Sequence, residues 1–425
     1  MTLTAANTDH KRSNARMAGL ALLLGFVFNA IGRGVGDTYI VFILPLSAEF
    51  GWNRSEISSV YSVYMLATGL SAPFVGMLFD RFGPRVVYSC GLGCLGLAYV
   101  TAGSLNHLWQ FYLCVGVAGG LGVASLGMVP AASLVSRWFR GNTGTALGVA
   151  YAGLGCGTLL IVPLAQYMSV SVGWRDAYHV LGGVLLVLLP FIVLIPWKAL
   201  WAGPGVGGHT ADFSQARKHE AASAKGTLRA AIRTPAFWSL AQVFGFTGLA
   251  MYTILVQTIA FLVETGMAPL QAASAYGVAG MLSVGGVMAS GALADRIGYR
   301  RTVAGSFVFT LIGIASLLGL SHNPSPWLLV TFIGFFGIAQ GARGPVVSGL
   351  CAKIFPGAGL ATIYGVIYAC MSMGAATGSL VSGVLHDVTG GYRAGFMFSM
   401  VCVVIAIAPF WTSSSLKQAA LAMRR

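Results

Sequence analysis

Gly76-Met-Leu-Phe-Asp80-Arg81-Phe-Gly83-Pro-Arg85 is a short charged stretch that joins one long apolar run to the next. The same pattern returns in the second half of the chain as Gly291-Ala-Leu-Ala-Asp295-Arg296-Ile-Gly298-Tyr-Arg300. An internal repeat determines topology, so it has to be recognised before a fold is assigned. A connector that is used twice at half-chain spacing predicts a protein made of two similar halves.

Other landmarks keep the same order and nearly the same spacing. Pro130 corresponds to Pro345 at the offset that separates the two connector copies. Gly173-Trp-Arg175 corresponds to Gly391-Tyr-Arg393 at nearly the same offset. Chance similarity between apolar segments would not keep order and spacing together. The pattern therefore indicates an internal duplication that extends well beyond the connector.

The composition indicates a membrane protein. Of the 425 residues, 56% are hydrophobic and only 8% are charged, whereas soluble domains carry about 25% charged residues. Apolar stretches recur that are long enough to cross about 30 Å of hydrocarbon. Glycine is abundant, with 58 residues, and small residues let membrane helices pack closely. We therefore expect an all-α polytopic membrane protein.

Twelve transmembrane helices in two pseudo-symmetric six-helix bundles account for the apolar runs. The helices are expected at about 17–46, 55–79, 86–104, 108–136, 143–168, 175–197, 236–263, 271–293, 302–320, 326–350, 360–386 and 392–412. The bundles then occupy 17–197 and 236–412, with a polar linker at 198–235 and tails at 1–16 and 413–425.

Lys and Arg are distributed unevenly along the chain. Most of the 25 fall in the tails, the linker and the connectors of one side, whereas the connectors of the opposite side contain only Arg54, Arg175 and Arg393. Positively charged connectors tend to stay in the cytoplasm. We therefore expect a cell-membrane protein with both termini cytoplasmic. Its net charge of +14 is assigned to contact with anionic lipid rather than nucleic acid.

The sequence lacks the patterns that are typical of enzymes. The seven cysteines lie in apolar runs without the spacing of metal ligands or of a disulfide framework. Gly91-Leu-Gly-Cys-Leu-Gly96 has the letters of a dinucleotide fingerprint, but it lies inside an apolar run with no preceding strand. With no nucleotide phosphate loop, catalytic triad or metal cluster, we expect no enzyme activity, no cofactor, no metal and no use of ATP.

The repeated connector resembles the signature loop of the major facilitator superfamily of secondary transporters, Gly-x-Leu-x-Asp-Arg/Lys-x-Gly-Arg-Arg/Lys. The two copies depart from it at Pro84 and Tyr299. The matching residues are Gly76, Leu78, Asp80, Arg81, Gly83 and Arg85 in the first copy, and Gly291, Leu293, Asp295, Arg296, Gly298 and Arg300 in the second. The resemblance covers nearly the whole chain. It implies that both copies act as a conformational latch, which bridges helix ends in the outward-open state; the alternative is a positive loop that only sets topology.

A narrower resemblance concerns one branch of that superfamily. Phe50-Gly-Trp52-Asn-Arg54-Ser-Glu56 and Gly173-Trp-Arg175 resemble the monocarboxylate and oxalate–formate exchanger branch. The eukaryotic carriers of this branch keep an acidic residue and an arginine in helix 8, whereas residues 271–290 contain neither. Their cargo and coupling scheme are therefore not transferred whole.

Three charged residues lie deep inside apolar runs, namely Arg33, Asp37 and Arg343. A charge at the bilayer centre costs about 2.5–3.5 kcal/mol on insertion scales and is a functional candidate by default. Arg33 and Asp37 lie one helical turn apart, so they could bind substrate and proton or simply neutralise each other. Arg343 has no acid in its own helix, and the resemblance places helices 1, 4, 7 and 10 around a central cavity. Because a guanidinium matches a carboxylate, we expect Arg343 to be the main anion anchor; the alternative is a structural pair with Asp37 across the halves.

Asp37 is the expected proton-coupling residue. Burial favours the neutral form of a carboxyl group, whereas a nearby arginine favours the charged form. A substrate that arrives at the arginine would loosen this pairing and favour protonation. Further residues that are expected to line the path share a polar or aromatic side chain; the alternative for each is packing or an interhelical hydrogen bond. They are Asn29, Tyr39, Tyr61, Tyr64, Tyr252, Gln257, Tyr276, Gln340, Tyr364 and Tyr368.

These observations predict a secondary active transporter that works by alternating access, with its site between the bundles. The expected cargo is a small organic anion such as a monocarboxylate, moved with protons or exchanged, by a protein that functions as a monomer. Two alternatives stay open: a proton-antiport exporter of drugs or amphiphilic metabolites, and a membrane sensor that binds ligand without transport.

Overall fold

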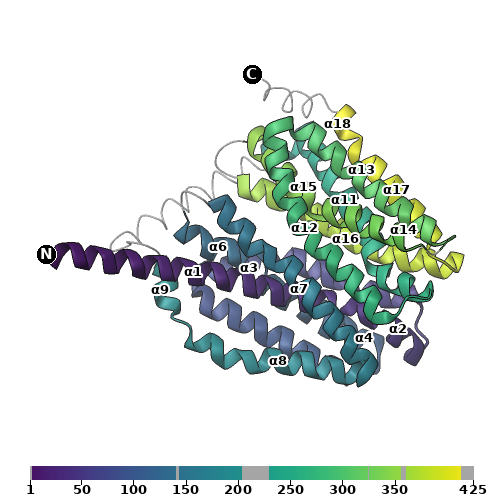
Figure 1. Ribbon diagram of the computed structural model, residues 1–425, viewed down its shortest axis with the longest axis horizontal. Coiled ribbons are helices and arrows are strands. Elements are labelled where there is room, and N and C mark those ends of the chain that lie inside the picture. Colours follow the sequence, from purple (N-terminus) through teal and green to yellow (C-terminus); the bar gives the residue numbers. More distant parts are fainter. Residues whose placement is uncertain (1, 140–142, 203–228, 324, 356–359, 413–425) are drawn as a thin grey trace.

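The structure is a computed structural model that describes residues 2–139, 143–202, 229–323, 325–355 and 360–412 (Figure 1). Most of the predicted linker and the predicted C-terminal tail lie outside the described residues. All regular elements within these ranges are helical. The elements of the first half are α1 Thr2–Asp37, α2 Tyr39–Phe50, α3 Arg54–Ala102, α4 Leu108–Phe111, η1 Tyr112–Gly119, α5 Gly120–Leu126, α6 Met128–Trp138, α7 Thr143–Ser171, α8 Trp174–Leu194 and α9 Trp197–Ala202.

The second half repeats this order. Its elements are α11 Pro235–Glu264, α12 Pro269–Ile297, α13 Tyr299–Leu320, α14 Pro326–Thr331, η2 Phe332–Phe336, α15 Gly337–Ile354, α16 Leu360–Thr389, α17 Arg393–Ile407 and α18 Pro409–Thr412. The segments η1 and η2 are π-helical turns at the same place in each half, where they widen the helix between α4 and α5 and between α14 and α15.

Twelve segments of the described residues are long and apolar enough to cross a membrane, as the sequence predicts. They are Asn14–Phe50, Arg54–Phe79, Arg81–Ala102, Leu108–Val135, Ala146–Ser171, Trp174–Ile192, Pro235–Glu264, Pro269–Ala294, Tyr299–Leu320, Pro326–Cys351, Ile363–Thr389 and Arg393–Thr412. One local difference concerns the N-terminus, because α1 already begins at Thr2, inside the segment expected to be a polar tail.

The two copies of the connector contain a glycine in the same unusual conformation. Gly83 has φ 81° and ψ 175° and kinks α3, and Gly298 has φ 90° and ψ 150° where α12 ends and α13 begins. This region is accessible essentially only to glycine, which explains why the repeat has glycine at both positions. The side chains of Asp80 and Asp295 are outside the described set, so the latch role of the connectors stays a prediction.

Small residues allow the helices to pack closely inside each half. A Cβ atom on Gly157 would lie 2.0 Å from the carbonyl oxygen of Ala30, which brings α7 against α1. A Cβ atom on Gly374 would likewise lie 2.0 Å from the carbonyl oxygen of Gly245, which brings α16 against α11. Such close approach is how membrane helices gain packing energy without a hydrophobic effect between them.

The halves meet along two seams, with α3 packed against α16 and α7 packed against α12. In Figure 1 the first half (purple to teal) and the second half (green to yellow) diverge toward the side on which α1 begins and α18 ends. We call this side the basic side and the opposite side, where α3 begins at Arg54, the far side.

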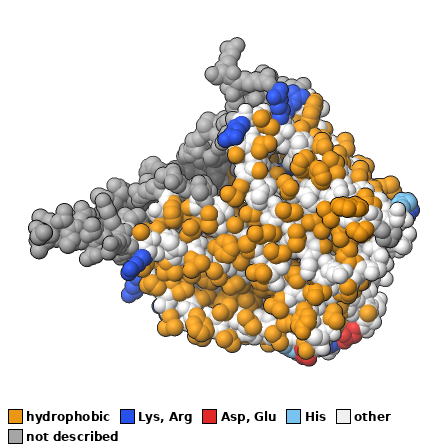
Figure 2. Space-filling view, in the orientation of Figure 1, with side chains coloured by type: hydrophobic (Ala, Val, Ile, Leu, Met, Phe, Trp, Pro, Cys, Tyr) orange, Lys and Arg blue, Asp and Glu red, His pale blue; other side chains and the backbone are white. Residues whose placement is uncertain are grey.

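Hydrophobic side chains cover most of the molecular face shown in Figure 2. Lys and Arg appear at its basic edge, whereas Asp and Glu appear at the opposite edge. An apolar band between polar edges is the surface that a bilayer requires of a membrane protein.

Candidate functional site

The first candidate membrane span, Asn14–Phe50, contains an ion pair of α1 near its middle. Arg33 Nε lies 2.9 Å from Asp37 Oδ2, one helical turn away. The Asp37 side chain is almost completely buried, at 2% exposure, whereas 23% of the Arg33 side chain is exposed. A buried carboxylate requires compensating partners, and here the arginine supplies one while part of its guanidinium stays accessible.

Two hydroxyl groups complete the surroundings of Asp37. Tyr61 of α3 donates a hydrogen bond to Oδ1 at 3.3 Å. Thr158 of α7 donates to Oδ2 at 3.1 Å. Both carboxylate oxygens therefore accept hydrogen bonds from neighbouring helices of the first half, and Asp37 is the only acidic residue among the buried residues that the structure describes.

Arg33 also connects the two halves. Its Nη1 donates to the Tyr252 hydroxyl of α11 at 3.2 Å. Tyr252 follows Asp37 at the offset of the two connector copies, so the two residues occupy the same position in the repeat. One guanidinium thus binds a carboxylate in its own half and the matching phenol in the other half, which makes its surroundings sensitive to the relative position of the halves.

Local backbone features place this pair. Helix α1 ends at Asp37, and α2 begins at Tyr39 after a tight turn in which Thr38 N donates to Val35 O. A Cβ atom on Gly36 would lie 2.0 Å from the Tyr64 hydroxyl, so only glycine admits this ring. The Tyr64 ring centroid in turn lies 5.2 Å from that of Tyr61. The turn and the glycine therefore bring an aromatic wall against the ion pair.

Some of the other residues predicted from the sequence have structural partners away from the pair. Asn29 donates to the carbonyl oxygens of Gly25 and Ala150 at 2.8 and 3.3 Å. Tyr39 donates to Ile57 O at 2.8 Å, although its ring lies 6.2 Å from that of Tyr61. These bonds hold helices of the first half together.

The remaining predicted residues belong to the second half. Gln257 donates to Ser58 Oγ of the first half at 3.1 Å. Tyr368 is partly exposed and lies 6.5 Å from Phe244 between ring centroids. Gln340 is half-buried, and its Oε1 accepts no hydrogen bond within the described residues. A role for these side chains in substrate binding stays a prediction.

Arg343 lies in a separate environment. Its Nη2 donates to Ser306 O at 3.3 Å and to the Thr310 hydroxyl, and its Cζ lies 4.3 Å from the Phe307 ring centroid. All three residues belong to α13 of the same half. Asp37 accepts its hydrogen bonds from Arg33, Tyr61 and Thr158 instead. The described contacts thus do not join Arg343 to Asp37, and its expected role as an anion anchor stays a prediction.

Thr158 was not singled out from the sequence. It is a threonine within an apolar segment, and such residues usually bond to the backbone of their own helix. Thr158 does so with Leu154 O at 3.1 Å while it also donates to Asp37. Its importance becomes visible only when α1 and α7 are packed together.

Charged groups join the halves on the far side. Arg54 Nη2 of α3 lies 2.6 Å from Glu264 Oε1 of α11. The backbone N–H groups of Arg54 and Ser55 donate to the carboxylate of Asp387 of α16 at 3.0 and 2.8 Å. An acidic group at a helix N-terminus accepts hydrogen bonds from the free N–H groups and interacts favourably with the positive end of the helix dipole. A residue of the second half therefore caps a helix of the first.

A second layer lies below these charges. Ser379 donates to Ser58 O at 2.8 Å, and a Cβ atom on Gly383 would lie 2.5 Å from Arg54 O. We refer to Arg54, Glu264 and Asp387 as the far-side gate. All hydrogen bonds between α3 and α16 in the described part of the chain involve residues 54 to 58 at the far end of α3, so the two helices are fastened on the far side.

Comparison with known proteins places the chain in a family. The model of the Major Facilitator Superfamily matches residues 22–322 and 285–420. The chain belongs to this superfamily. The chain is therefore a transporter of this superfamily, and its described residues contain twelve segments that could span a membrane.

Relatives with curated names are similar to this chain over most of its length. An uncharacterised MFS-type transporter, YcxA of Bacillus subtilis, is 24% identical over 96% of this chain and 98% of its own. Monocarboxylate transporter 13 of Bos taurus is 28% identical over 89% of this chain and 85% of its own. Monocarboxylate transporter 12 of Rattus norvegicus is 27% identical over 88% of this chain and 82% of its own.

Solved structures of the superfamily have the same fold. A bacterial homologue of the human lysosomal transporter Spinster, in an inward-facing and unoccupied conformation, superposes with a TM-score of 0.68 over 96% of this chain and 94% of its own. Its sequence is 15% identical. At this identity the likeness concerns the fold alone, and the chemistry has to be derived from the side chains of this chain.

Proposed function

We propose that this transporter carries a small organic anion, with a monocarboxylate as the expected cargo, and that Arg33 and Asp37 form its coupling site. The observation that carries the proposal is that the guanidinium of Arg33 forms hydrogen bonds to residues of both halves. It binds the buried carboxylate of Asp37 and the Tyr252 hydroxyl of the other half, and 23% of its side chain remains exposed. An arginine in this position can accept a carboxylate through a planar pair of N–H donors.

Charge balance provides the coupling. The pair in its present state is neutral. A substrate carboxylate that binds Arg33 adds a second negative charge to a site with one cation, and an uncompensated buried charge is costly. A proton on Asp37 restores neutrality, so anion and proton cross together. If Asp37 keeps its proton, the empty site holds the uncompensated cation of Arg33 and returns only with another anion, which is exchange.

The aromatic groups around the pair suit the remainder of such a substrate. Tyr61 lies between Tyr64 and Tyr252, with ring centroids 5.2 and 6.2 Å away. Aromatic rings provide apolar contact area together with hydroxyl groups that bond polar atoms. The relatives named as monocarboxylate transporters support the same class of cargo. Because residues 271–290 contain no charge, Arg33 takes the anion in our proposal, with Arg343 as the second candidate.

The position of the bonds between the halves supports alternating access as the transport mechanism. The far-side gate holds the far ends of α3, α11 and α16 together, while the halves diverge toward the basic side (Figure 1). Rocking of one bundle against the other would open the gate and close the basic side. The Arg33–Tyr252 bond crosses the halves near the middle, so substrate at Arg33 is positioned to influence this motion.

The distribution of basic residues supports a cell-membrane location with the basic side, and therefore both termini, in the cytoplasm. In that orientation the described conformation would be closed to the outside. We also propose that a single chain is the functional unit, because the Arg33–Asp37 site and the far-side gate are built from residues of one chain.

Uptake into proteoliposomes with an imposed pH gradient tests the proposed function. The cargo panel contains aliphatic and aromatic monocarboxylates, and wild type is measured beside Arg33→Gln, Arg33→Lys and Arg343→Gln. We expect saturable uptake that Arg33→Gln abolishes and Arg33→Lys weakens, since lysine keeps the charge but not the planar fork. Loss of uptake only in Arg343→Gln would move the anchor to Arg343. Uptake of neutral or cationic compounds alone, indifferent to both arginines, would contradict the proposal and favour a proton-antiport exporter.

A further inference from the structure

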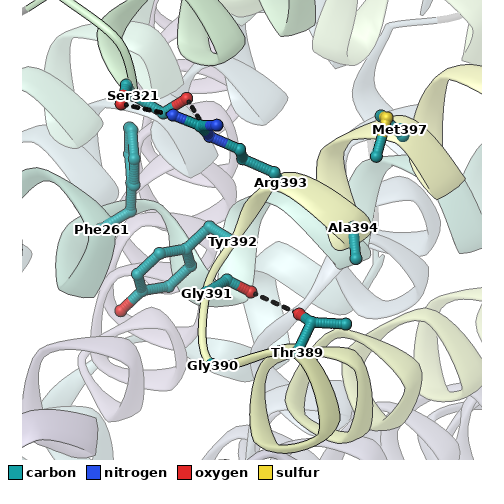
Figure 3. A pocket seen from close by; sticks show the side chains of 9 residues that line it. All are labelled: Phe261, Ser321, Thr389, Gly390, Gly391, Tyr392, Arg393, Ala394 and Met397. Carbon is teal, nitrogen blue, oxygen red and sulfur yellow. Dashed lines mark hydrogen bonds between the residues drawn. The ribbon is translucent and has the colours of Figure 1, made fainter.

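A cavity on the far side is lined by residues other than those of the Arg33–Asp37 site. Its volume is about 480 Å³, which is within the range of small-molecule sites. Figure 3 shows the residues that line it, which come from the ends of α11, α13 and α16 and from the start of α17. They are Phe261, Ser321, Thr389, Gly390, Gly391, Tyr392, Arg393, Ala394 and Met397.

Arg393 provides the charge of this cavity. Its Nε donates to Ser321 Oγ and its Nη2 donates to Ser321 O, both at 3.2 Å (Figure 3). The side chain is exposed, and it forms no ion pair with an acidic residue of the described chain. The guanidinium is therefore a cation that is held in place by one neutral residue, with donor groups left over.

The equivalent arginine of the first half is neutralised. Arg175 corresponds to Arg393 in the repeated Gly-aromatic-Arg motif, and it binds Glu49 Oε1 through Nη2 at 2.8 Å and Nε at 3.2 Å. Arg175 also donates to Asn106 Oδ1 at 2.9 Å. Arg393 donates to Ser321 in the same way, and Ser321 follows Asn106 at the offset of the two connector copies. The two arginines thus occupy the same place in the repeat, but only one has a carboxylate.

The second half has a glutamate equivalent to Glu49, but this glutamate pairs with a different arginine. Glu264 corresponds to Glu49 at the connector offset, and both precede a left-handed glycine, Gly51 with φ 67° and Gly266 with φ 97°. Glu264 binds Arg54 in the far-side gate instead of Arg393. The position equivalent to Arg54 in the second half is Pro269, so this diversion occurs in one half only. It leaves Arg393 without the carboxylate partner that neutralises Arg175.

Apolar groups surround this charge. Phe261 and Tyr392 stand close together, with ring centroids 5.3 Å apart, and Met397 lines the cavity beyond Ala394 (Figure 3). Burial mainly raises the pKa of the Tyr392 phenol, so this ring contributes a neutral hydroxyl group. The cavity therefore combines one guanidinium fork with aromatic and thioether walls.

We propose that the Arg393 cavity is a second anion-binding site, which takes an oxyanion attached to an apolar body. The oxyanion occupies the place that Glu49 fills in the first half and binds the guanidinium donors of Arg393, while the apolar body lies against Phe261, Tyr392 and Met397. Two sources carry this chemistry, a soluble aromatic or short aliphatic carboxylate and the headgroup of an anionic lipid. The site is separate from the Arg33–Asp37 site and does not depend on the proposed transport function.

Binding of radiolabelled benzoate to the full-length protein in phosphatidylcholine nanodiscs tests the site. The background variant is Arg33→Gln, which removes the proposed central anion contact. We expect benzoate to bind this variant, and we expect Arg33→Gln/Arg393→Gln to bind about tenfold more weakly or worse, since a charge-assisted hydrogen bond is lost. Arg33→Gln/Arg393→Lys should retain part of the affinity, which separates loss of charge from loss of folding. Benzamide, which has the same ring without a charge, should show no dependence on Arg393.

Two results would overturn the proposal. In the first, Arg33→Gln binds no benzoate in nanodiscs with or without anionic lipid, and wild type retains no more anionic lipid than Arg393→Gln does. The other is equal benzoate binding with and without the Arg393 charge. Adding phosphatidylglycerol to the nanodisc separates the two sources of the oxyanion. If this lipid competes with benzoate, and if wild type retains it but Arg393→Gln does not, the site binds lipid. If the lipid does not compete, the site binds soluble carboxylates. Failure of the Arg33 transport experiment would leave this result unaffected, because the readout is binding rather than uptake.

Discussion

Asp37 is held by donors from three helices, which distinguishes it from a simple surface ion pair. Arg33 is its neighbour on α1, Tyr61 comes from α3 and Thr158 from α7. An exposed pair of this spacing would contribute about 0.3–0.5 kcal/mol. Because Asp37 is buried, each donor contributes more to the stability of the fold. A buried acceptor that loses its donor is not compensated for the loss of water, and this lowers the free energy of unfolding.

Thr158→Val tests this interpretation of the residue. The substitution keeps the shape of the side chain but removes the donor to Asp37 Oδ2. We expect the free energy of unfolding to fall by about 1–2 kcal/mol, measured as a lower midpoint of thermal unfolding in detergent. Thr158→Ser retains the hydroxyl and should stay close to wild type. Equal effects of Val and Ser would indicate that packing rather than the hydrogen bond is responsible.

The sequence could predict only part of the site at this scale. The spacing of Arg33 and Asp37 was sufficient to place them on one face of a helix, because helical periodicity is local. The direction in which the Arg343 side chain points was not predictable, since it depends on which neighbouring helix packs against that side of α15. The structure turns it toward Thr310 and Phe307. Thr158 was missed for the same reason, because its partner lies 121 residues away.

Helix α3 shows how a short connector is folded at the scale of the element. The chain passes from one membrane span to the next through Gly83, whose φ of 81° and ψ of 175° interrupt an otherwise helical segment. Pro84 follows and has no N–H group to leave unpaired at this point. The repeat of the same backbone state at Gly298 shows that geometry, as well as charge, determines the connector.

Gly83→Ala should therefore be destabilising. A non-glycine residue in this region of φ and ψ costs about 1–3 kcal/mol. We expect a lower midpoint of thermal unfolding than for wild type. Gly183→Ala provides the matched control, because this glycine lies within α8 with no atom within 4 Å of an added Cβ, and alanine favours a helix. A neutral Gly83→Ala would contradict the assigned backbone conformation.

The elements themselves were largely predictable from apolar length, since a membrane span leaves little choice but a helix. Local irregularities were not predictable in this way. The break at Thr38 and the π-helical turns η1 and η2 depend on how neighbouring helices pack. The break ends α1 at Asp37, the residue that we propose for proton coupling.

The whole molecule combines a symmetric fold with asymmetric charges. The helices repeat from half to half, but Arg33 has Gly248 and Arg54 has Pro269 at the equivalent positions. The cross-half contacts of both arginines therefore occur once in the molecule. Duplication provides the two bundles. The arginines that occur in one half only provide the proposed coupling site and the far-side gate between the bundles.

Loosening the gate should shift the population of conformations. Arg54→Gln removes the ion pair with Glu264 and should allow the far ends of α3 and α16 to separate more often. We expect longer distances between spin labels placed at these two helix ends. Glu56→Gln is the control, because Glu56 accepts from Asn53 N at the same end of α3 without contacting the second half. Unchanged distances in Arg54→Gln would show that the gate does not hold the closed far side.

At this largest scale the sequence predicted the two halves and their fold, because the repeated connector and the apolar lengths are local features. Which side is closed was not predictable. Conformations of a transporter differ by small free energies, and the closure seen here rests on pairs such as Arg54–Glu264 that are 210 residues apart. Such pairs become apparent only when the bundles are placed against each other.

Asp37→Asn provides the most direct test of the coupling site. Asparagine keeps the size of the side chain and one acceptor oxygen, but it has no carboxylate that can take up the coupled proton. Reconstituted wild type should accumulate carboxylate in response to an inward pH gradient and should also exchange labelled for unlabelled carboxylate without one. We predict that Asp37→Asn loses gradient-driven accumulation while it retains exchange. Accumulation that still follows the pH gradient in Asp37→Asn would contradict the assignment of Asp37 as the proton-coupling residue.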